Sequence, residues 1–284
     1  MRIGAPAAGW GAFVGAAIGA SLAPMPVQLA FAAGAIGVVG MTHGAGNLAV
    51  VGVERRGRFM LLYALVSIVC LGWWIAAPAS ALPAFLIASA IHFGIEDAPA
   101  GLLAERGARG IGLVAATATL HHAELVRIVE LGGVAPDVAP ALVQGLAWFG
   151  GLAAVALIGL AVARGDRRLL VGIAALLALP PLVGFSVGFL ILHALPQTRA
   201  RARRLGRPDT AAYLLTVWPV LLAAVVLLGL VGAVLLPSDP SGMRPLFAGI
   251  AALAVPHLLV TPWFERREAP GVAARSLPGT GRLA

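Results

Sequence analysis

The sequence lacks the residues that disulfides and thiolate metal sites require. It contains one cysteine, Cys70, and no lysine, so all 20 basic residues are arginines. A single cysteine can form neither an internal disulfide nor a cysteine-based metal cluster. Charged residues make up only 11% of the chain, against roughly a quarter in ordinary soluble domains. A soluble fold this apolar could not cover its own surface, so the composition predicts a membrane protein.

Long apolar runs occupy most of the chain. A helix needs about 20 apolar residues to cross a bilayer. The runs therefore predict an all-α fold, a polytopic transmembrane helix bundle of about eight to ten spans. The candidate spans are Ala8–Ala23, Met25–Val51, Phe59–Pro78, Ala81–Glu96, Gly110–Val126, Ala139–Ala163, Leu169–Leu179, Leu182–Leu195, Ala211–Leu236 and Pro245–Phe264. The alternative is eight spans and a re-entrant pair, formed by the two short runs that meet at Pro180-Pro181.

The arginines gather between the apolar runs and orient them. Most clusters fall on the side predicted to be cytoplasmic, as the positive-inside rule requires; only Arg127 and Arg244 do not. Both termini are therefore expected in the cytoplasm of a multi-pass protein of the cell inner (plasma) membrane. We expect one transmembrane domain over 1–264 and a short, polar, disordered cytoplasmic tail over 265–284. Arginines in the loops account for the net positive charge of the chain. The expected partner is therefore membrane lipid and not nucleic acid.

All six histidines fall inside predicted spans. They are His43, His92, His121, His122, His193 and His257. An ionisable side chain at membrane depth is costly, so each is a candidate for function. The alternative is a histidine that only bonds a neighbouring helix. For six such residues in one small membrane domain, we favour the functional interpretation.

Four of these histidines are predicted to share one layer of the membrane. His43, His92, His193 and His257 each precede the cytoplasmic end of a span by about four to eight residues, which is roughly 6–12 Å at the helical rise. Imidazoles that converge in a dry bundle suit a borderline divalent metal such as iron, zinc or copper. The spacing alone does not select among these metals.

Several other polar residues lie near the histidines in the sequence. A ligand histidine often donates its second N–H to a carboxylate. His122 and Glu124 are candidates either for such contacts or for lining a substrate site, although Glu124 equally suits the outer interface. Asp97 follows His92 and is a candidate for a contact of this kind. Glu96 shares a helix face with His92, but we favour the interpretation that it is a charged helix end.

Five segments, in order along the chain, resemble the motifs of one family. Met41–Asn47 resembles Pro-His-Gly-x-x-Asp, Ile91–Asp97 resembles His-Phe-Gly-x-x-Asp, and Leu120–Leu125, after Arg109-Gly110, resembles an Arg-Gly…His-x-x-Glu-Val segment. Gly188–His193 resembles the start of an aromatic-rich His-Ser-x-Arg-His segment, and Pro256-His257 matches a late Pro-His. The chain thus resembles the Brp/Blh (bacterio-opsin-related protein) family of membrane β-carotene 15,15′-dioxygenases.

The resemblance implies a reaction, a cofactor and a ligand set. The family cleaves the central double bond of β-carotene with O₂ to give retinal, using non-haem Fe²⁺ held by histidines. His43, His92 and His193 match its ligands. The place of a fourth histidine holds Gln197, and Asn47 stands where the family has Asp. Either Gln197, through its amide oxygen, or His257 is then expected to complete the metal site.

The same resemblance implies a carotenoid substrate that enters from the lipid phase, with O₂ as co-substrate. An apolar tunnel would receive it, and four aromatic residues of the spans are candidates to line that tunnel, although aromatic residues in spans more often serve helix packing. The four candidates are Phe93, Trp148, Phe185 and Phe189.

Two other classes of function remain as alternatives. One is a non-catalytic membrane transporter or a metal- or retinoid-handling protein; transporters typically show repeats or broken helices, and here only the Pro180-Pro181 break hints at one. The other is a diverged membrane metalloenzyme with a different lipid substrate. A hydrolase of that kind would want a carboxylate beside its metal. Stoichiometric iron in the purified protein separates the first alternative from the enzymes.

Overall fold

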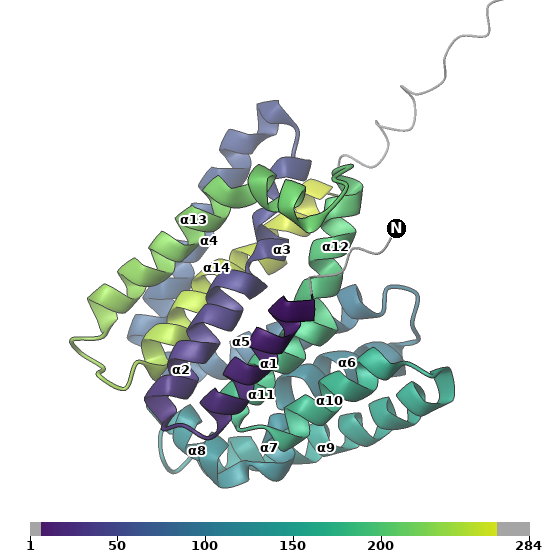
Figure 1. The fold of residues 1–284 in the computed structure, drawn as a ribbon. Helices are drawn as coiled ribbons and strands as arrows, with labels where there is room; N and C mark the ends of the chain where they lie inside the picture. Colours follow the sequence, from purple (N-terminus) through teal and green to yellow (C-terminus); the bar gives the residue numbers. More distant parts are fainter. Residues whose placement is uncertain (1–6, 266–284) are drawn as a thin grey trace, which may run out of the picture.

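The computed structural model describes residues 7–265 of the chain (Figure 1). Within this range the ordered elements are all helices, which confirms the predicted all-α class. The longer helices are α1 (Ala7–Ser21), α2 (Met25–Gly34), α4 (Arg56–Ala76), α5 (Pro78–Asp97), α6 (Leu103–Ala115), α8 (His122–Leu131), α9 (Ala139–Arg164), α10 (Arg167–Ala178), α11 (Pro181–Phe189), α12 (Leu195–Arg204), α13 (Thr210–Leu235) and α14 (Met243–Glu265). Apart from Glu265, the tail expected over 265–284 lies outside the described residues.

Seven stretches in the described part of the chain are long and apolar enough to cross a membrane. They are Met25–Ala45, Val53–Ala76, Pro78–Asp97, Ala139–Arg164, Pro181–Arg204, Thr210–Leu235 and Met243–Phe264. The other three expected spans correspond to shorter helices: α1 and α10, and a segment that breaks into α6, α7 (Thr117–Leu120) and α8. The protein is therefore a multi-pass helical membrane protein. The orientation of its termini stays a prediction.

The outward faces of the long helices carry large apolar side chains. Leu215 on α13 is 76% exposed and Leu61 on α4 is 69% exposed. In water such faces would be unfavourable, whereas lipid tails solvate them. The helices form two groups, with α4, α13 and α14 on one side and α6, α9 and α10 on the other (Figure 1). Helices α2, α5 and α11 lie between the groups.

Helix α5 is fixed by close backbone packing against α6. A Cβ atom added to Gly110 would collide with the carbonyl oxygen of Ala90, and one added to Gly94 would collide with that of Arg106. Small residues allow this approach in lipid, where the hydrophobic effect drives no helix association. The position of His92 on α5 therefore depends on two glycines.

Helix α6 is in turn held to α9 by an ion-pair cluster. Glu105 accepts hydrogen bonds from Arg164 at 2.8 and 2.9 Å, and from Arg109 at 3.0 and 3.1 Å. Arg164, and then Arg109, lower the pKa of the Glu105 carboxyl below its usual range because they stabilise its charged form. This cluster lies at the polar end of the α6–α9 pair.

Two π-helical turns interrupt helices close to the histidines. Ala35–Gly40 follows α2 and precedes the short helix α3 (Thr42–Ala45), and Leu190–Ala194 joins α11 to α12. Pro196, just after the second turn, has no N–H to donate to the carbonyl four residues earlier, which favours a wider turn there. The first turn is placed before His43, and the second contains His193.

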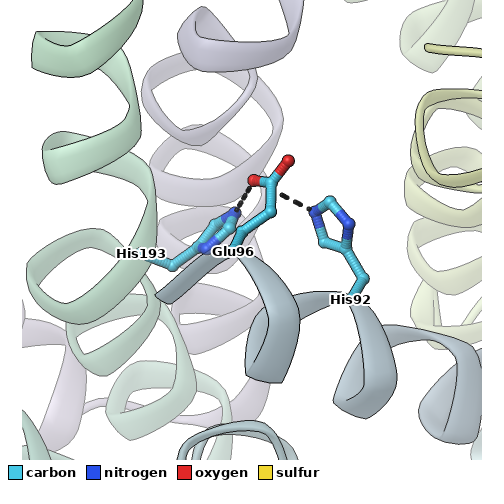
Figure 2. Close-up of side chains that lie close together, drawn as sticks. All are labelled: His92, Glu96 and His193. Atoms are coloured by element: carbon cyan, nitrogen blue, oxygen red, sulfur yellow. Dashed lines mark ion pairs between the residues drawn. The ribbon is translucent and has the colours of Figure 1, made fainter. Parts of the chain in front are cut away.

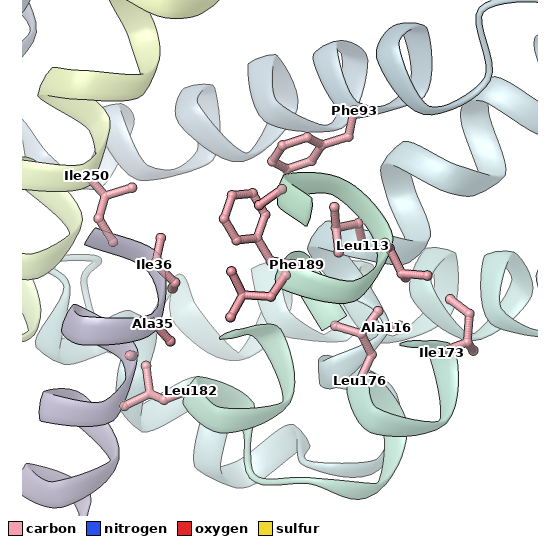
Figure 3. Close-up of a cluster of buried hydrophobic side chains, with 14 of the residues drawn as sticks. Ala35, Ile36, Phe93, Leu113, Ala116, Ile173, Leu176, Leu182, Phe189 and Ile250 are labelled. Atoms are coloured by element: carbon pink, nitrogen blue, oxygen red, sulfur yellow. The ribbon is translucent and has the colours of Figure 1, made fainter. Parts of the chain in front are cut away.

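The buried core connects the two helix groups beneath the site. Figure 3 shows Phe93 from α5 and Phe189 from α11 packed among Leu113, Ile36 and Ile250. Tyr213 on α13 is also fully buried, and its hydroxyl donates to the carbonyl of Thr42 at 2.7 Å. These contacts set the position of the segment that carries His43.

Candidate metal centre

Four imidazole rings from different parts of the chain form a closed ring of neighbours. The ring centroids are 5.0 Å apart for His43 and His193, 5.3 Å for His43 and His257, 5.5 Å for His92 and His193, and 5.0 Å for His92 and His257. His43, His193 and His257 are buried, and the His92 side chain is 11% exposed. The structure thus brings together the four histidines that the sequence placed in one layer.

In two of these rings the Nδ1 atom has a hydrogen-bond acceptor, which fixes the tautomer of the imidazole. His43 donates from Nδ1 to the carbonyl of Gly40 at 2.6 Å. His193 donates from Nδ1 to the carboxylate of Asp97 at 3.0 and 3.1 Å. A proton on Nδ1 leaves the lone pair of Nε2 available to a metal. The expected contact between Asp97 and a histidine is therefore present, and its partner is His193.

His257 has a comparable partner in Asn47. Nδ2 of Asn47 lies 2.6 Å from Nδ1 of His257 and donates to Oγ1 of Thr261 at 3.0 Å, and Asn47 Oδ1 is buried without a partner. An amide has the same shape in both orientations. With Oδ1 turned toward the ring, it accepts from Nδ1–H of His257, and Nε2 of His257 is left for a metal.

Glu96 also reaches the ring of imidazoles. Figure 2 shows its carboxylate between His92 and His193. Its Oε2 is 3.5 Å from Nε2 of His92 and 4.0 Å from Nε2 of His193. These three side chains form a group whose donor atoms all lie within 4.8 Å of one another. Glu96 lies at the end of α5, as expected, and its carboxylate is also directed at His92, one turn back on the same helix face, and at His193 in the π-helical turn after α11.

Gln197 does not point into the ring. Its Nε2 donates to the carbonyl of Glu96 at 3.2 Å and to Oδ1 of Asp97 at 3.3 Å. The side chain thus supports the carboxylate that holds His193. The geometry therefore favours His257 over Gln197 as the fourth metal ligand.

The donor set fits a borderline metal such as iron. The Nε2 atoms of His92, His193 and His257 are all buried with no hydrogen-bond partner. An unpartnered buried polar atom is costly, and three of them in one ring are explained by a shared ligand. Neutral imidazoles with one carboxylate are typical donors for iron or zinc. The residues present therefore fit the ion that the sequence resemblance implies.

An apolar cavity of about 420 Å³ opens onto one side of this ring. His43, His92 and His257 are among the residues that line it. Its walls come from α4, α5, α8, α11, α13 and α14 and include Phe93, Phe185 and Phe189. The three phenylalanines were expected there. Trp148 was not correctly predicted: it is 74% exposed on α9 and does not line the cavity.

Some residues that line the cavity are also exposed on the outer surface of the bundle. Helices α4 and α13 pack against α14, and both contribute wall residues, among them Ile68 and Ala223. The Ile68 side chain is 66% exposed. The wall of the cavity is therefore continuous with the apolar outer surface of α4.

The remaining histidines lie apart from the ring. His121 occupies the break between α7 and α8, where its Nε2 donates to the carbonyl of Leu177 at 3.1 Å and its Nδ1 lies 3.8 Å from Glu124. Nε2 of His122 is buried without a partner. Among the described residues, neither His122 nor Glu124 lines the cavity or contacts the four imidazoles. Their expected roles stay predictions.

Two features of the site were not anticipated from the sequence. One is the inward position of Glu96, for which the spacing of four from His92 was an available signal. The other is the pair of π-helical turns, for which only Pro196 offered a signal.

The fold and the site define a multi-pass helical membrane protein with a histidine-rich cluster open to an apolar cavity. The family model described as beta-carotene 15,15′-dioxygenase matches residues 34–265, and the chain belongs to this family. No curated protein and no solved structure matches the chain. The matched range contains all four histidines of the ring.

Proposed function

We propose that this protein holds one Fe²⁺ ion and cleaves β-carotene, or a related carotenoid, with O₂ at the central double bond. The observation that carries the proposal is the ring of four imidazoles, three with unpartnered buried Nε2 atoms, beside an apolar cavity that three of them line. Family membership supports the substrate class. His43, His92, His193 and His257 would hold the metal.

The reaction requires O₂ and no water. One β-carotene and one O₂ give two retinal molecules: the central C=C bond and the O–O bond break, and each carbon of the former double bond receives one oxygen atom. Bound iron supplies the activation of O₂ or of the alkene. Atoms and electrons balance without another reductant. No proton is transferred overall, which is consistent with a cavity that is almost free of ionisable side chains beyond the histidines.

The chain's own residues would orient the substrate and exclude water. The apolar walls bind the polyene, and Phe93 and Phe189 pack beside His193, with ring centroids 4.6 and 5.5 Å from its imidazole. Asp97 and Asn47 hold the tautomers of His193 and His257. Exclusion of water protects reactive intermediates from side reactions.

Metal analysis of the purified protein tests the metal site. We expect about one iron per chain, and loss of that iron in His43→Ala and His193→Ala. His121→Ala is the matched control, because His121 lies in another part of the bundle and should keep the metal. Iron retained in both ring variants would overturn the site, and wild-type protein without iron would favour a transporter or retinoid-handling protein.

Glu96 favours one second candidate, a metal-dependent membrane hydrolase. Such an enzyme uses a carboxylate close to its metal, and Glu96 Oε2 is 3.5 Å from Nε2 of His92. The two candidates differ in their need for O₂. Conversion of a membrane lipid that continues under anaerobic conditions would support the hydrolase, whereas the dioxygenase stops.

A further inference from the structure

Glu96 occupies a distinctive place among the residues of the site. His43, His92 and His257 line the apolar cavity, but Glu96, Asp97 and His193 do not. The Glu96 side chain is 30% exposed, whereas those of His193 and Asp97 are 0% and 7% exposed. The carboxylate therefore approaches the imidazoles from the side opposite the cavity.

The distances from Glu96 suit direct coordination. Two donors that are each about 2.1 Å from one ion lie about 3.0 Å apart at a right angle and about 4.2 Å apart on opposite sides. Oε2 of Glu96 is 3.5 Å from Nε2 of His92 and 4.0 Å from Nε2 of His193. Both separations fall within this range, so one ion can contact all three atoms without a large movement of any side chain.

Charge favours the same arrangement. Four neutral imidazoles leave the charge of a divalent ion uncompensated in a low-dielectric site, which is unfavourable. Asp97 contributes one negative charge, but Nδ1 of His193 uses both of its oxygens. Glu96 is the carboxylate with an oxygen directed at the Nε2 side of the rings.

We propose that Glu96 is a fifth, anionic metal ligand that occupies the coordination position facing away from the cavity. The one position left open on a six-coordinate ion would then face the cavity, where O₂ and the polyene arrive. Glu96 thereby determines the side of the metal on which substrate binds. This inference rests on the proposed iron site, and it adds a carboxylate to a ligand set otherwise made of histidines.

Metal affinity and the spectrum of a substituted metal test the proposal together. Wild type, Glu96→Gln, Glu96→Asp and the control Glu130→Gln would be purified in one detergent and loaded with Fe²⁺ in competition with a chelator. We expect both Glu96 variants to bind iron at least about tenfold more weakly, since even the loss of a ligand's outer partner costs about 10–100-fold. Glu130 lies on α8, outside the ring, and its variant should bind as the wild type does.

Co²⁺ in place of Fe²⁺ reports the number of ligands. Loss of the Glu96 carboxylate lowers the coordination number, so the visible d–d bands of the Glu96→Gln protein should become stronger and shift. Glu96→Asp keeps the charge but shortens the side chain by one methylene group, so it should change the spectrum in the same direction. Thermal unfolding of the metal-free proteins verifies that all variants are folded.

The outcomes separate this inference from the proposed function. Wild type that binds iron, with variants of Glu96 that bind it equally well and show the wild-type Co²⁺ spectrum, would overturn the ligand role of Glu96 alone. An unchanged spectrum with weaker binding in Glu96→Gln would mean that the carboxylate acts only through its charge, which also overturns the ligand role. Wild type without iron would overturn both.

Discussion

Asn47 and His257 are 210 positions apart in the sequence, yet the Asn47 amide lies 2.6 Å from Nδ1 of the His257 ring. Asp97 makes the equivalent contact with Nδ1 of His193 at 3.0 Å. The two pairs lie on opposite members of the imidazole ring, because His193 and His257 each neighbour His43 and His92. An amide on one side and a carboxylate on the other thus hold two histidines with their Nε2 atoms turned inward.

This relationship gives the first prediction. Asn47→Leu removes the acceptor for Nδ1–H of His257 and should weaken iron binding about 10–100-fold. Asn47→Asp keeps an acceptor in place and should bind iron at least as tightly as the wild type. Chelator competition measures both. Ser186→Ala, which removes a buried hydrogen bond to Leu182 elsewhere in the bundle, is the control; iron binding by Asn47→Leu that matches this control would contradict the role of Asn47.

Gln197 and His257 give the second prediction. Because Gln197 bonds Asp97 and Glu96 while His257 completes the ring, Gln197→His should not raise the yield of retinal in a carotene-accumulating bacterial host. His257→Ala should lose iron and leave the host orange. Extraction and chromatography of the retinoids quantify both. A marked rise of retinal with Gln197→His would show that the site lacks a ligand that His257 does not supply.

The packing of α5 on α6 gives the third prediction. A Cβ on Gly110 meets the backbone of Ala90, so Gly110→Ala should push α5 outward and destabilise the protein by about 1–3 kcal/mol. Displacement of His92 should also reduce bound iron. Gly107→Ala is the matched control on the same helix, because its added Cβ meets no atom within 4 Å. Thermal unfolding and metal analysis compare them, and equal melting temperatures would contradict the proposed close approach.

Much of the fold was predictable because lipid imposes simple constraints on sequence. A backbone segment that crosses a bilayer must satisfy its own hydrogen bonds, so a long apolar run predicts a helix. The runs from Phe59 to Pro78 and from Ala139 to Ala163 are helical in the structure, as expected. The broken segment around His121 was not predictable. Its apolar run looks continuous, and only the tertiary bond from His121 to Leu177 shows why the helix is interrupted there.

The candidate site was predictable in part for a similar reason. Histidine is costly at membrane depth, so its positions alone identified His43, His92, His193 and His257. The direction of a side chain depends on helix rotation and on partners far away in the sequence. For that reason the sequence could not decide between Gln197 and His257, and it did not show that the Glu96 carboxylate faces the histidines or that Trp148 lies on the outer surface.

The cavity gives the fourth prediction. Ala224 on α13 lines the cavity, and Ala224→Phe fills part of its approximately 420 Å³. Cleavage should fall strongly while bound iron stays at the wild-type level, because the change lies away from the imidazoles. Val226→Phe is the control, since Val226 is 50% exposed and does not line the cavity. Equal activity of the two variants would mean that the substrate takes another path.

The most direct test of the central claim is the product balance of the purified, iron-loaded protein. β-Carotene in detergent micelles would be incubated with ¹⁸O₂, and the products would be quantified by chromatography and mass spectrometry. The account predicts two retinal molecules for each β-carotene consumed, each carrying ¹⁸O before exchange with water, and no product from His43→Ala. β-Carotene that remains intact in the presence of stoichiometric iron and O₂ would contradict it.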